Sequence, residues 1–98
     1  MVEFKRTDEM VGTAERTIET ALNVIREREQ THGNKREVLN QIARLWRAYI
    51  GVPVDAHQVA TMMVLLKIAR SQNGEHNPDD FVDAVGYAAL AAEAREWK

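Results

Sequence analysis

The chain has 98 residues, of which 45% are hydrophobic and 29% charged, and its formal net charge at pH 7 is −2. This length indicates one domain over residues 1–98, with a core so limited that a homo-oligomer burying more surface is expected. The slightly acidic balance argues against a general nucleic-acid-binding protein, and the absence of cysteine excludes disulfides and thiolate metal sites.

Nothing in the sequence indicates secretion or membrane insertion. Residues 1–8 are charged and lack the apolar segment of a signal peptide, and we expect residues 1–7 to be disordered. The longest nearly apolar run, Val59–Leu66, is much shorter than the roughly 20 residues that span a bilayer. The sequence therefore predicts a cytoplasmic protein without a membrane partner.

The first predicted helix covers residues 8–30. Thr7 can cap its beginning, and Asp8 and Glu9 suit the positive end of the helix dipole in the first turn. Apolar residues recur at spacings of three and four, as they do on the buried face of an amphipathic helix. The residues expected to face the core are Val11, Ala14, Ile18, Leu22 and Ile25.

A second helix is predicted from Asn34 to Ile50. Gly33 ends the first helix in a left-handed conformation. Asn34 caps the second helix, and Glu37 lies three residues later, as a capping box requires. Gly51 and Pro53 end the second helix. The residues of its apolar face are expected to lie in the core: Val38, Leu39, Ile42, Leu45, Trp46 and Tyr49. For Trp46 the alternative is that its ring stacks on a base. Its basic face is expected to be solvated: Lys35, Arg36, Arg44 and Arg47.

The third predicted helix begins after Asp55, which forms a capping box with Gln58. Apolar residues cover most of its circumference: Val59, Met62, Met63, Val64, Leu65, Leu66 and Ile68. A helix that is apolar nearly all round is normally buried, so we expect this helix at the centre of the domain or of an oligomer.

The fourth predicted helix is capped by Asn77, has Pro78 at its first position and runs to about Glu96. The residues expected to face inward are Phe81, Val82, Val85, Ala88, Ala89 and Ala92. No strand pattern competes with these helices, and the short connections favour antiparallel neighbours. The predicted fold class is a compact all-α, four-helix domain.

Two basic residues end the third helix with helical spacing. Lys67 continues the apolar stripe of Ala60 and Met63, where packing gives no reason for a charge, and Arg70 lies one turn further on. Both could contact the phosphates of a ligand or pair with acidic residues of the next helix. The alternative is a favourable interaction with the negative end of the helix dipole.

Asp80 and Asp83 lie three residues apart on one face of the fourth helix, and Tyr87 follows on the same stripe. Two carboxylates at this spacing can coordinate Mg²⁺, which prefers oxygen ligands. The alternative for acidic residues in a first turn is helix capping, which explains Asp79 better than Asp83. Gly86 costs about 1 kcal/mol inside a helix, so close helix packing or space for a ligand should compensate for it.

Other polar residues carry weaker signals. Arg28 and His32 form a second polar group with Asn34 at the first turn, although a histidine near a helix end is more often solvated than ligand-binding. His57 and His76 lack the spacing of a zinc site. No glycine-rich phosphate loop or nucleophile motif is present, so no catalytic motif is complete.

Taken together, these residues resemble a family of small phage and prophage proteins of unknown function. The resemblance covers residues 26–93, and it implies the cytoplasm of a host cell as the location of a phage-encoded protein. The motifs that carry it are Thr31-His32-Gly33-Asn34, Ile42-Ala43-Arg44-Leu45-Trp46, Met62–Arg70 with its Lys-x-x-Arg ending, and Asp80-x-x-Asp83-x-x-Gly86-Tyr87.

That family is similar, more distantly, to MazG-like all-α nucleoside triphosphate pyrophosphohydrolases and to phage nucleotide-modification-associated domains. The similarity implies a nucleotide ligand and Mg²⁺ held near Asp80 and Asp83. MazG-like enzymes use two acidic pairs on two helices, the first being Glu-Glu-x-x-Glu, whereas this chain has Met62, Met63 and Lys67 at comparable places. A protein that binds without catalysis therefore fits these residues as well as an enzyme does.

Our first functional hypothesis is a phage-type accessory protein of nucleotide metabolism or nucleotide recognition. It would bind a phosphate-containing ligand where the third and fourth helices meet, through Lys67, Arg70 and Tyr87, with Arg28 and His32 as further ligand-binding candidates. The alternative is a non-enzymatic protein that binds a host protein, such as an inhibitor of bacterial defence. A third interpretation makes the charges a salt-bridge network that locks the two helices together.

Overall fold

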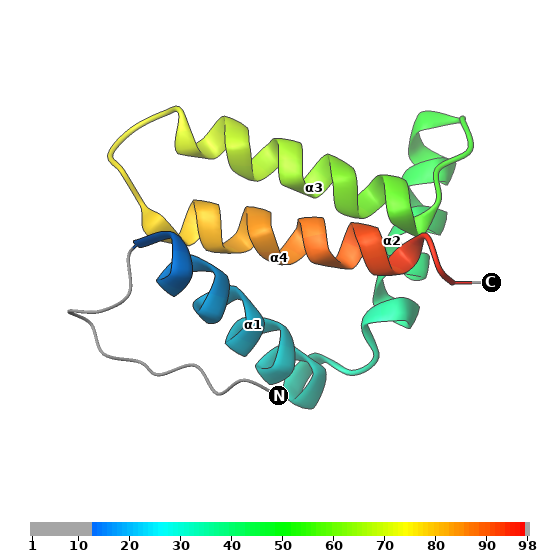
Figure 1. Cartoon of the computed structure of the whole chain (residues 1–98). Helices are drawn as coiled ribbons and strands as arrows, with labels where there is room; N and C mark the ends of the chain where they lie inside the picture. The colour runs from blue at the N-terminus through cyan, green and yellow to red at the C-terminus, as the bar shows by residue number, and fades with distance from the viewer. Residues whose placement is uncertain (1–12, 98) are drawn as a thin grey trace.

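The computed structural model describes residues 13–97, which form four α-helices joined by short connections (Figure 1). The helices are α1 (Thr13–His32), α2 (Lys35–Ile50), α3 (Ala56–Ser71) and α4 (Pro78–Ala94). No strand occurs in this part of the chain, so the predicted all-α four-helix class is confirmed. The expected disorder of residues 1–7 and the expected start of the first helix at Asp8 lie outside the described residues.

The predicted caps begin three of the helices. The side chain of Asn34 accepts hydrogen bonds from the backbone N–H groups of residues 36 and 37, at 2.8 and 3.2 Å. Asp55 and Gln58 form the expected reciprocal capping box, and Asn77 accepts from the backbone of residue 79 beside Pro78. Gly51 ends α2 with φ of 78°, in the left-handed region that favours glycine.

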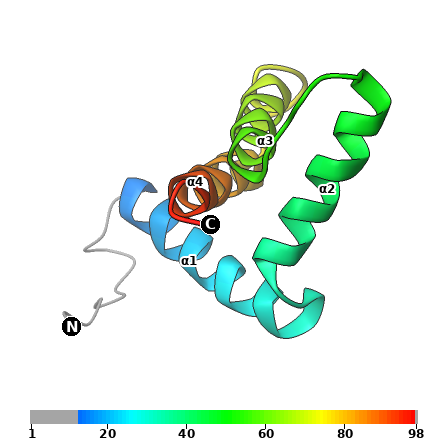
Figure 2. The same ribbon diagram turned by 90° about the vertical axis from the view of Figure 1, so that its right-hand side faces the viewer.

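Helices α3 and α4 run antiparallel and form the most extensive contact in the domain, with α1 packed on α4 and α2 on α3. Figure 2 shows α3 and α4 nearly end-on, while α1 and α2 diverge from their shared turn on either side of them. The opening between α1 and α2 therefore faces the α3–α4 pair. None of the described helices is long and apolar enough to cross a membrane.

The core consists mostly of small side chains. Val59 is the largest fully buried residue among those described, and alanines of α3 and α4 supply much of the rest. The core cluster contains Leu39, Ala43, Val54, Ala56, Val59, Ala60, Ala91 and Ala94. Trp46 packs against this cluster and is partly buried, so its expected place near the core is confirmed. Because the buried side chains are short, α3 and α4 can approach each other closely.

The expectation that α3 is buried nearly all round is wrong for the domain itself. Its inward side is buried at Ala56, Val59 and Ala60, but its outer side is exposed, with Leu65 at 64%. The physical reason is that α3 packs on α4 along one side and on α2 near its beginning, which leaves a third side uncovered. The other expectation, a helix central to an oligomer, stays a prediction.

Several expected core residues of the other helices are also exposed. In α2, Tyr49 is 92% exposed, because the side of the helix that reaches the core is narrower than expected. It consists of Leu39, Ile42, Ala43 and Trp46. In α4, whose many alanines mark no clear face, the expectation is confirmed for Val82, which is buried, but the buried residues also include Asp80 and Ala84, which were not expected there. The expected inward residues found exposed are Ala14, Ile18, Leu22, Val38, Leu45, Tyr49, Phe81, Ala88, Ala89 and Ala92.

Candidate functional site

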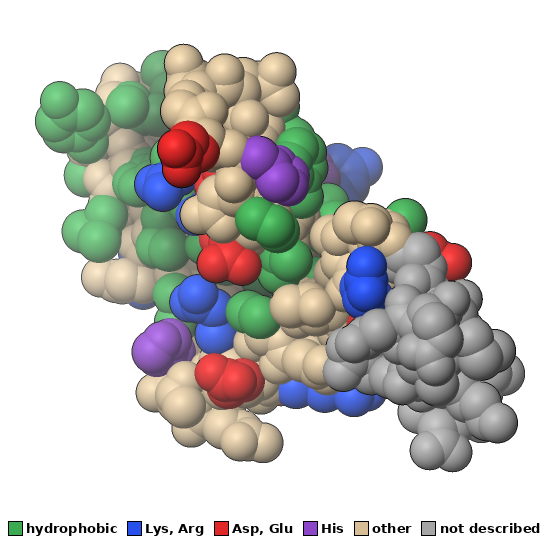
Figure 3. Space-filling model, turned by 90° about the vertical axis from the view of Figure 1, so that its left-hand side faces the viewer, with side chains coloured by type: hydrophobic (Ala, Val, Ile, Leu, Met, Phe, Trp, Pro, Cys, Tyr) green, Lys and Arg blue, Asp and Glu red, His purple; other side chains and the backbone are tan. Residues whose placement is uncertain are grey.

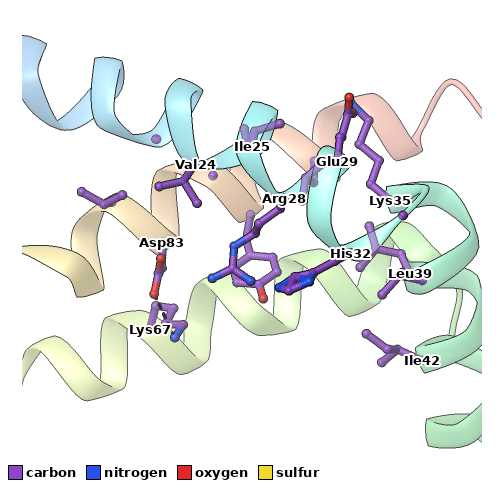
Figure 4. A pocket seen from close by; sticks show the side chains of 17 residues that line it. Val24, Ile25, Arg28, Glu29, His32, Lys35, Leu39, Ile42, Lys67 and Asp83 are labelled. Atoms are coloured by element: carbon purple, nitrogen blue, oxygen red, sulfur yellow. Dashed lines mark ion pairs between the residues drawn. The ribbon is translucent and has the colours of Figure 1, made fainter.

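A cavity of about 200 Å³ lies where α1, α2 and α4 meet, and Lys67 reaches it from α3 (Figure 4). Most of its wall is apolar, which follows from the inner stripes of the three helices that enclose it. These apolar residues include Val24, Ile25, Leu39, Ile42, Val82 and Leu90. The lining also contains polar and charged side chains: Arg28, Glu29, His32, Lys35, Lys67, Asp83 and Tyr87. An apolar pocket with a few converging polar groups is typical of a small-molecule site.

The structure brings together five of the seven site residues predicted from the sequence. These five are Arg28, His32, Lys67, Asp83 and Tyr87. The other two, Arg70 and Asp80, do not line the cavity. They form an ion pair of their own, with 3.5 Å between Arg70 Nε and Asp80 Oδ1. The candidate site is therefore centred between α1, α2 and α4, away from the α3–α4 connection where the sequence placed it.

Lys67 and Asp83 form an ion pair beside the cavity, with 3.1 Å between Nζ and Oδ2 (Figure 4). Their side chains are 18% and 27% exposed, so water screens the pair only in part. A second ion pair joins the same two helices: Arg70, one turn after Lys67 on α3, pairs with Asp80, one turn before Asp83 on α4. Two pairs with this spacing follow directly from antiparallel packing. The predicted salt-bridge network between the helices therefore exists, and one of its two pairs also lines the cavity.

The expected Mg²⁺ site is not supported by the surroundings of its two carboxylates. Asp80 and Asp83 lie near one another on α4, but each already faces a cation of α3. Within residues 13–97, no group of three or more histidine, aspartate or glutamate side chains could hold a metal ion. Because Mg²⁺ is held by carboxylates that are free to coordinate it, these residues do not fit a magnesium site.

Arg28 and His32 lie one turn apart on α1, and both point toward the middle of the cavity (Figure 4). In the described part of the chain, neither side chain forms an ion pair or hydrogen bond. An arginine carries a permanent charge and five N–H donors in a planar arrangement that matches phosphate and carboxylate groups. Both side chains are exposed, so Arg28 is a solvent-accessible charged donor that points toward the apolar pocket and has no protein partner there.

Lys35 is a site residue that sequence reasoning assigned to the solvated face of α2. Its ammonium lies 2.8 Å from Glu29 of α1 and 2.9 Å from Glu93 of α4, and it lines the cavity. The hydrogen bonds to Glu29 and then Glu93 favour the charged form and raise the pKa of Lys35. Its partners come from two other helices, so no local spacing in the sequence could have identified it.

Gly86 lines the cavity in the middle of α4. A Cβ added there would lie 4.0 Å from Cγ1 of Ile25, which is an ordinary van der Waals distance. The expectation that close packing of a neighbouring helix requires glycine is therefore wrong, because α1 leaves room for a methyl group. Space for a ligand, the other explanation from the sequence, stays a prediction.

The remaining histidines have structural surroundings. His57 Nδ1 lies 2.8 Å from the carbonyl oxygen of Ala91 and so joins the beginning of α3 to the end of α4. His76 packs against Phe81, with 6.1 Å between ring centroids. Neither residue lines the cavity.

Comparison with known proteins agrees with the resemblance to phage proteins. The chain is 43% identical over 65 residues to the Gene 55 protein of Mycobacterium phage L5, covering 65% of this chain and 42% of that protein. It is 32% identical over 94 residues to the Gene 55 protein of Mycobacterium phage D29, covering 86% of this chain and 62% of that protein.

The chain therefore spans less than two thirds of the length of these two relatives. No solved structure is significantly similar to it. The likeness to phage proteins is thus confirmed, whereas no relationship to MazG-like enzymes is found. One family model matches residues 16–95, which contain all the residues of the cavity, and the chain accordingly belongs to the family described as a domain of unknown function (DUF6378).

Proposed function

We propose that the cavity between α1, α2 and α4 binds a small phosphate-containing ligand, and that the protein acts in nucleotide metabolism or nucleotide recognition. The observation that supports this most directly is Arg28, whose guanidinium points into an apolar cavity without a protein partner. Charge-assisted hydrogen bonds from arginine to phosphate are strong and often bidentate. Because Arg28 is exposed, water solvates its guanidinium, and a ligand phosphate would replace that water.

The rest of the lining suits the remainder of such a ligand. Val24 and Ile42 offer apolar walls for a ring, and Tyr87 offers an aromatic surface and a hydroxyl group. His32 is a second donor one turn from Arg28. Lys67 is already paired with Asp83, so it would attract the phosphate electrostatically without a direct hydrogen bond. Arg70 lies outside the cavity and has no direct role in this proposal.

The residues favour recognition over catalysis. The comparisons show no relationship to MazG-like enzymes, and the sequence resemblance that suggested a nucleotide ligand also lacks one of the two acidic pairs on which those enzymes depend. Here the pair on α4 is Asp80 and Asp83, and both carboxylates face cations of α3. Activation of water by a bound metal is therefore not part of the proposed function.

Calorimetric titration with a panel of canonical, modified and cyclic nucleotides tests the proposal. We expect Arg28→Ala to weaken binding about 10- to 100-fold, because a hydrogen bond to a charged group contributes about 1.5–3 kcal/mol. Arg26→Ala is the matched control, since Arg26 lies on the same helix, is exposed and does not line the cavity. Absence of binding at high protein concentration, or equal losses in the two variants, would contradict the proposal.

The exposed apolar side chains favour a second candidate, a non-enzymatic protein that binds a host protein such as a component of bacterial defence. Leu65, Met62 and Ile68 are exposed on α3, and Tyr49 protrudes from α2. In Figure 3, hydrophobic side chains gather along one side of the face in view, next to mixed acidic and basic ones. Contiguous exposed apolar surface often marks a site of protein association.

This second candidate makes a different prediction about variants. Capture of a host protein should be lost in Leu65→Glu and retained in Arg28→Ala, because Leu65 is exposed and does not line the cavity. The ligand-binding candidate predicts the reverse pattern for nucleotide affinity. A host protein retained equally by both variants, or by neither, would count against the apolar surface as its binding site.

A further inference from the structure

Resting on the proposed phosphate site, we infer that the ligand is a phosphate monoester with an apolar or ring-containing body, of the nucleoside monophosphate class. Nucleoside di- and triphosphates are excluded by this inference. The inference depends on which charges at the cavity already have partners and on how much space the cavity encloses.

Arg28 is the one permanent cation of the lining that has no partner in the described part of the chain. Lys35 is held between Glu29 and Glu93, and Lys67 is held by Asp83. A single phosphate group carries a charge of about −1.5 to −2 at neutral pH. Arg28, with His32 as a second donor, matches one such group.

A polyphosphate would lack neutralisation at this site. Each further phosphate adds negative charge, and the cavity lining already contains the carboxylates of Asp83 and Glu29. Proteins that bind nucleoside triphosphates usually neutralise them with Mg²⁺ held by carboxylates. Within residues 13–97, the two aspartates that could do so are paired with Lys67 and Arg70. Neither cations nor metal ligands are thus available for additional phosphates.

The size of the cavity supports the same conclusion. Its volume of about 200 Å³ is smaller than the roughly 300–1,000 Å³ of pockets that enclose drug-sized ligands. It therefore has space for the base or a comparable apolar group, with the sugar outside and the phosphate beside the exposed side chains of Arg28 and His32. A longer phosphate chain would extend into water, where it would gain no contact.

Calorimetric titration tests the inference with one purine series and one pyrimidine series. Each series contains the nucleoside and its 5′-mono-, di- and triphosphates, and each compound is measured with and without Mg²⁺. Inorganic phosphate is a further probe. We expect the monophosphate to bind at least tenfold more tightly than the nucleoside, the triphosphate or phosphate alone, with no effect of Mg²⁺. Tighter binding of a triphosphate, or a requirement for Mg²⁺, would overturn the inference while leaving the phosphate site intact. Failure of every compound to bind would overturn both.

A charge variant provides an independent check. Asp83→Asn removes the partner of Lys67 and leaves a second unpaired cation at the cavity, so the preference for monophosphate over triphosphate should fall at least fivefold. Asp79→Asn is the matched control, because Asp79 is exposed and does not line the cavity. If Asp83→Asn does not fold, Glu29→Gln removes one negative charge from the same lining. An unchanged preference in the folded variant would overturn the inference.

Discussion

The ammonium group of Lys67 and the carboxylate of Asp83 lie 3.1 Å apart, join α3 to α4, and form part of the cavity lining at the same time. Each side chain is more than two thirds shielded from water. A pair in this position stabilises the domain through contact between the helices and also determines the charge that a ligand meets. The structural and functional interpretations of these two residues are therefore compatible.

Removal of one member of this pair should destabilise the domain. We expect Asp83→Ala to lower the free energy of unfolding by about 1–3 kcal/mol, because it leaves the Lys67 ammonium partly buried without a partner. The double variant Lys67→Met/Asp83→Leu should recover most of this loss, since it removes both charges. Arg26→Ala is the control and should cost less than about 1 kcal/mol, because Arg26 is exposed and forms no ion pair within residues 13–97. Urea unfolding measures these differences, and equal costs for all three variants would contradict the assignment.

Gly86→Ala should increase stability and weaken ligand binding together. The added methyl group would lie 4.0 Å from Ile25 without a clash, and alanine is favoured over glycine in a helix by about 1 kcal/mol. The same methyl group would enter the cavity. The matched control is Ala88→Gly, at an exposed position of α4 outside the cavity, which should lose about 1 kcal/mol and bind normally. Thermal unfolding and calorimetry together check this prediction, and unchanged affinity in Gly86→Ala would argue against a ligand role for Gly86.

Stability at alkaline pH should depend on Lys35. Its pKa in the folded protein is raised above the ordinary value of 10.5, chiefly by Glu29 and then by Glu93. The stabilisation that it provides is therefore complete below pH 10.5 and is lost as the pH rises through the higher folded value. We expect the stability difference between the native protein and Lys35→Met to be constant up to about pH 9.5 and to shrink above pH 10.5. Urea midpoints at a series of pH values measure it, and a difference independent of pH would show that the ion pairs do not stabilise the fold.

The exposed side of α3 should determine whether the protein self-associates. We expect the native chain to form a homo-oligomer and Leu65→Glu to be monomeric, because the substitution places a charge on an apolar surface that an interface would bury. Ile18→Glu is the control, since Ile18 is similarly exposed but lies on α1. Size-exclusion chromatography with light scattering provides the readout. A monomeric native chain would contradict the oligomer and leave this surface to the host-protein candidate.

The features that could be predicted from the sequence are those encoded by short spacings. Asn34, Asp55 and Asn77 each begin a helix because a side-chain oxygen lies next to free backbone N–H groups, and this arrangement is visible in a few residues. Lys67 was recognisable because it interrupts an apolar stripe. The antiparallel packing of α3 and α4 then places it opposite Asp83, as one of the sequence hypotheses required.

The features that could not be predicted depend on contacts between distant segments. The alanines of α4 give little contrast between its sides, so its buried stripe through Ala84 and Ala91 could not be distinguished from the stripe through Phe81. The two partners of Lys35 belong to other helices. The lining of the cavity combines side chains from all four helices, among them Arg28 of α1 and Lys67 of α3.

The antiparallel arrangement of the two ion pairs also determines where this chain tolerates changes in length. Residues 72–77, which connect α3 to α4, are all exposed and supply no side chain to either pair or to the cavity. Extra residues or an epitope tag inserted there would leave the relative register of the two helices unchanged. One residue inserted between Asp80 and Asp83 would instead rotate everything after it by about 100° around the helix axis, separating Asp83 from Lys67 and turning Tyr87 out of the cavity.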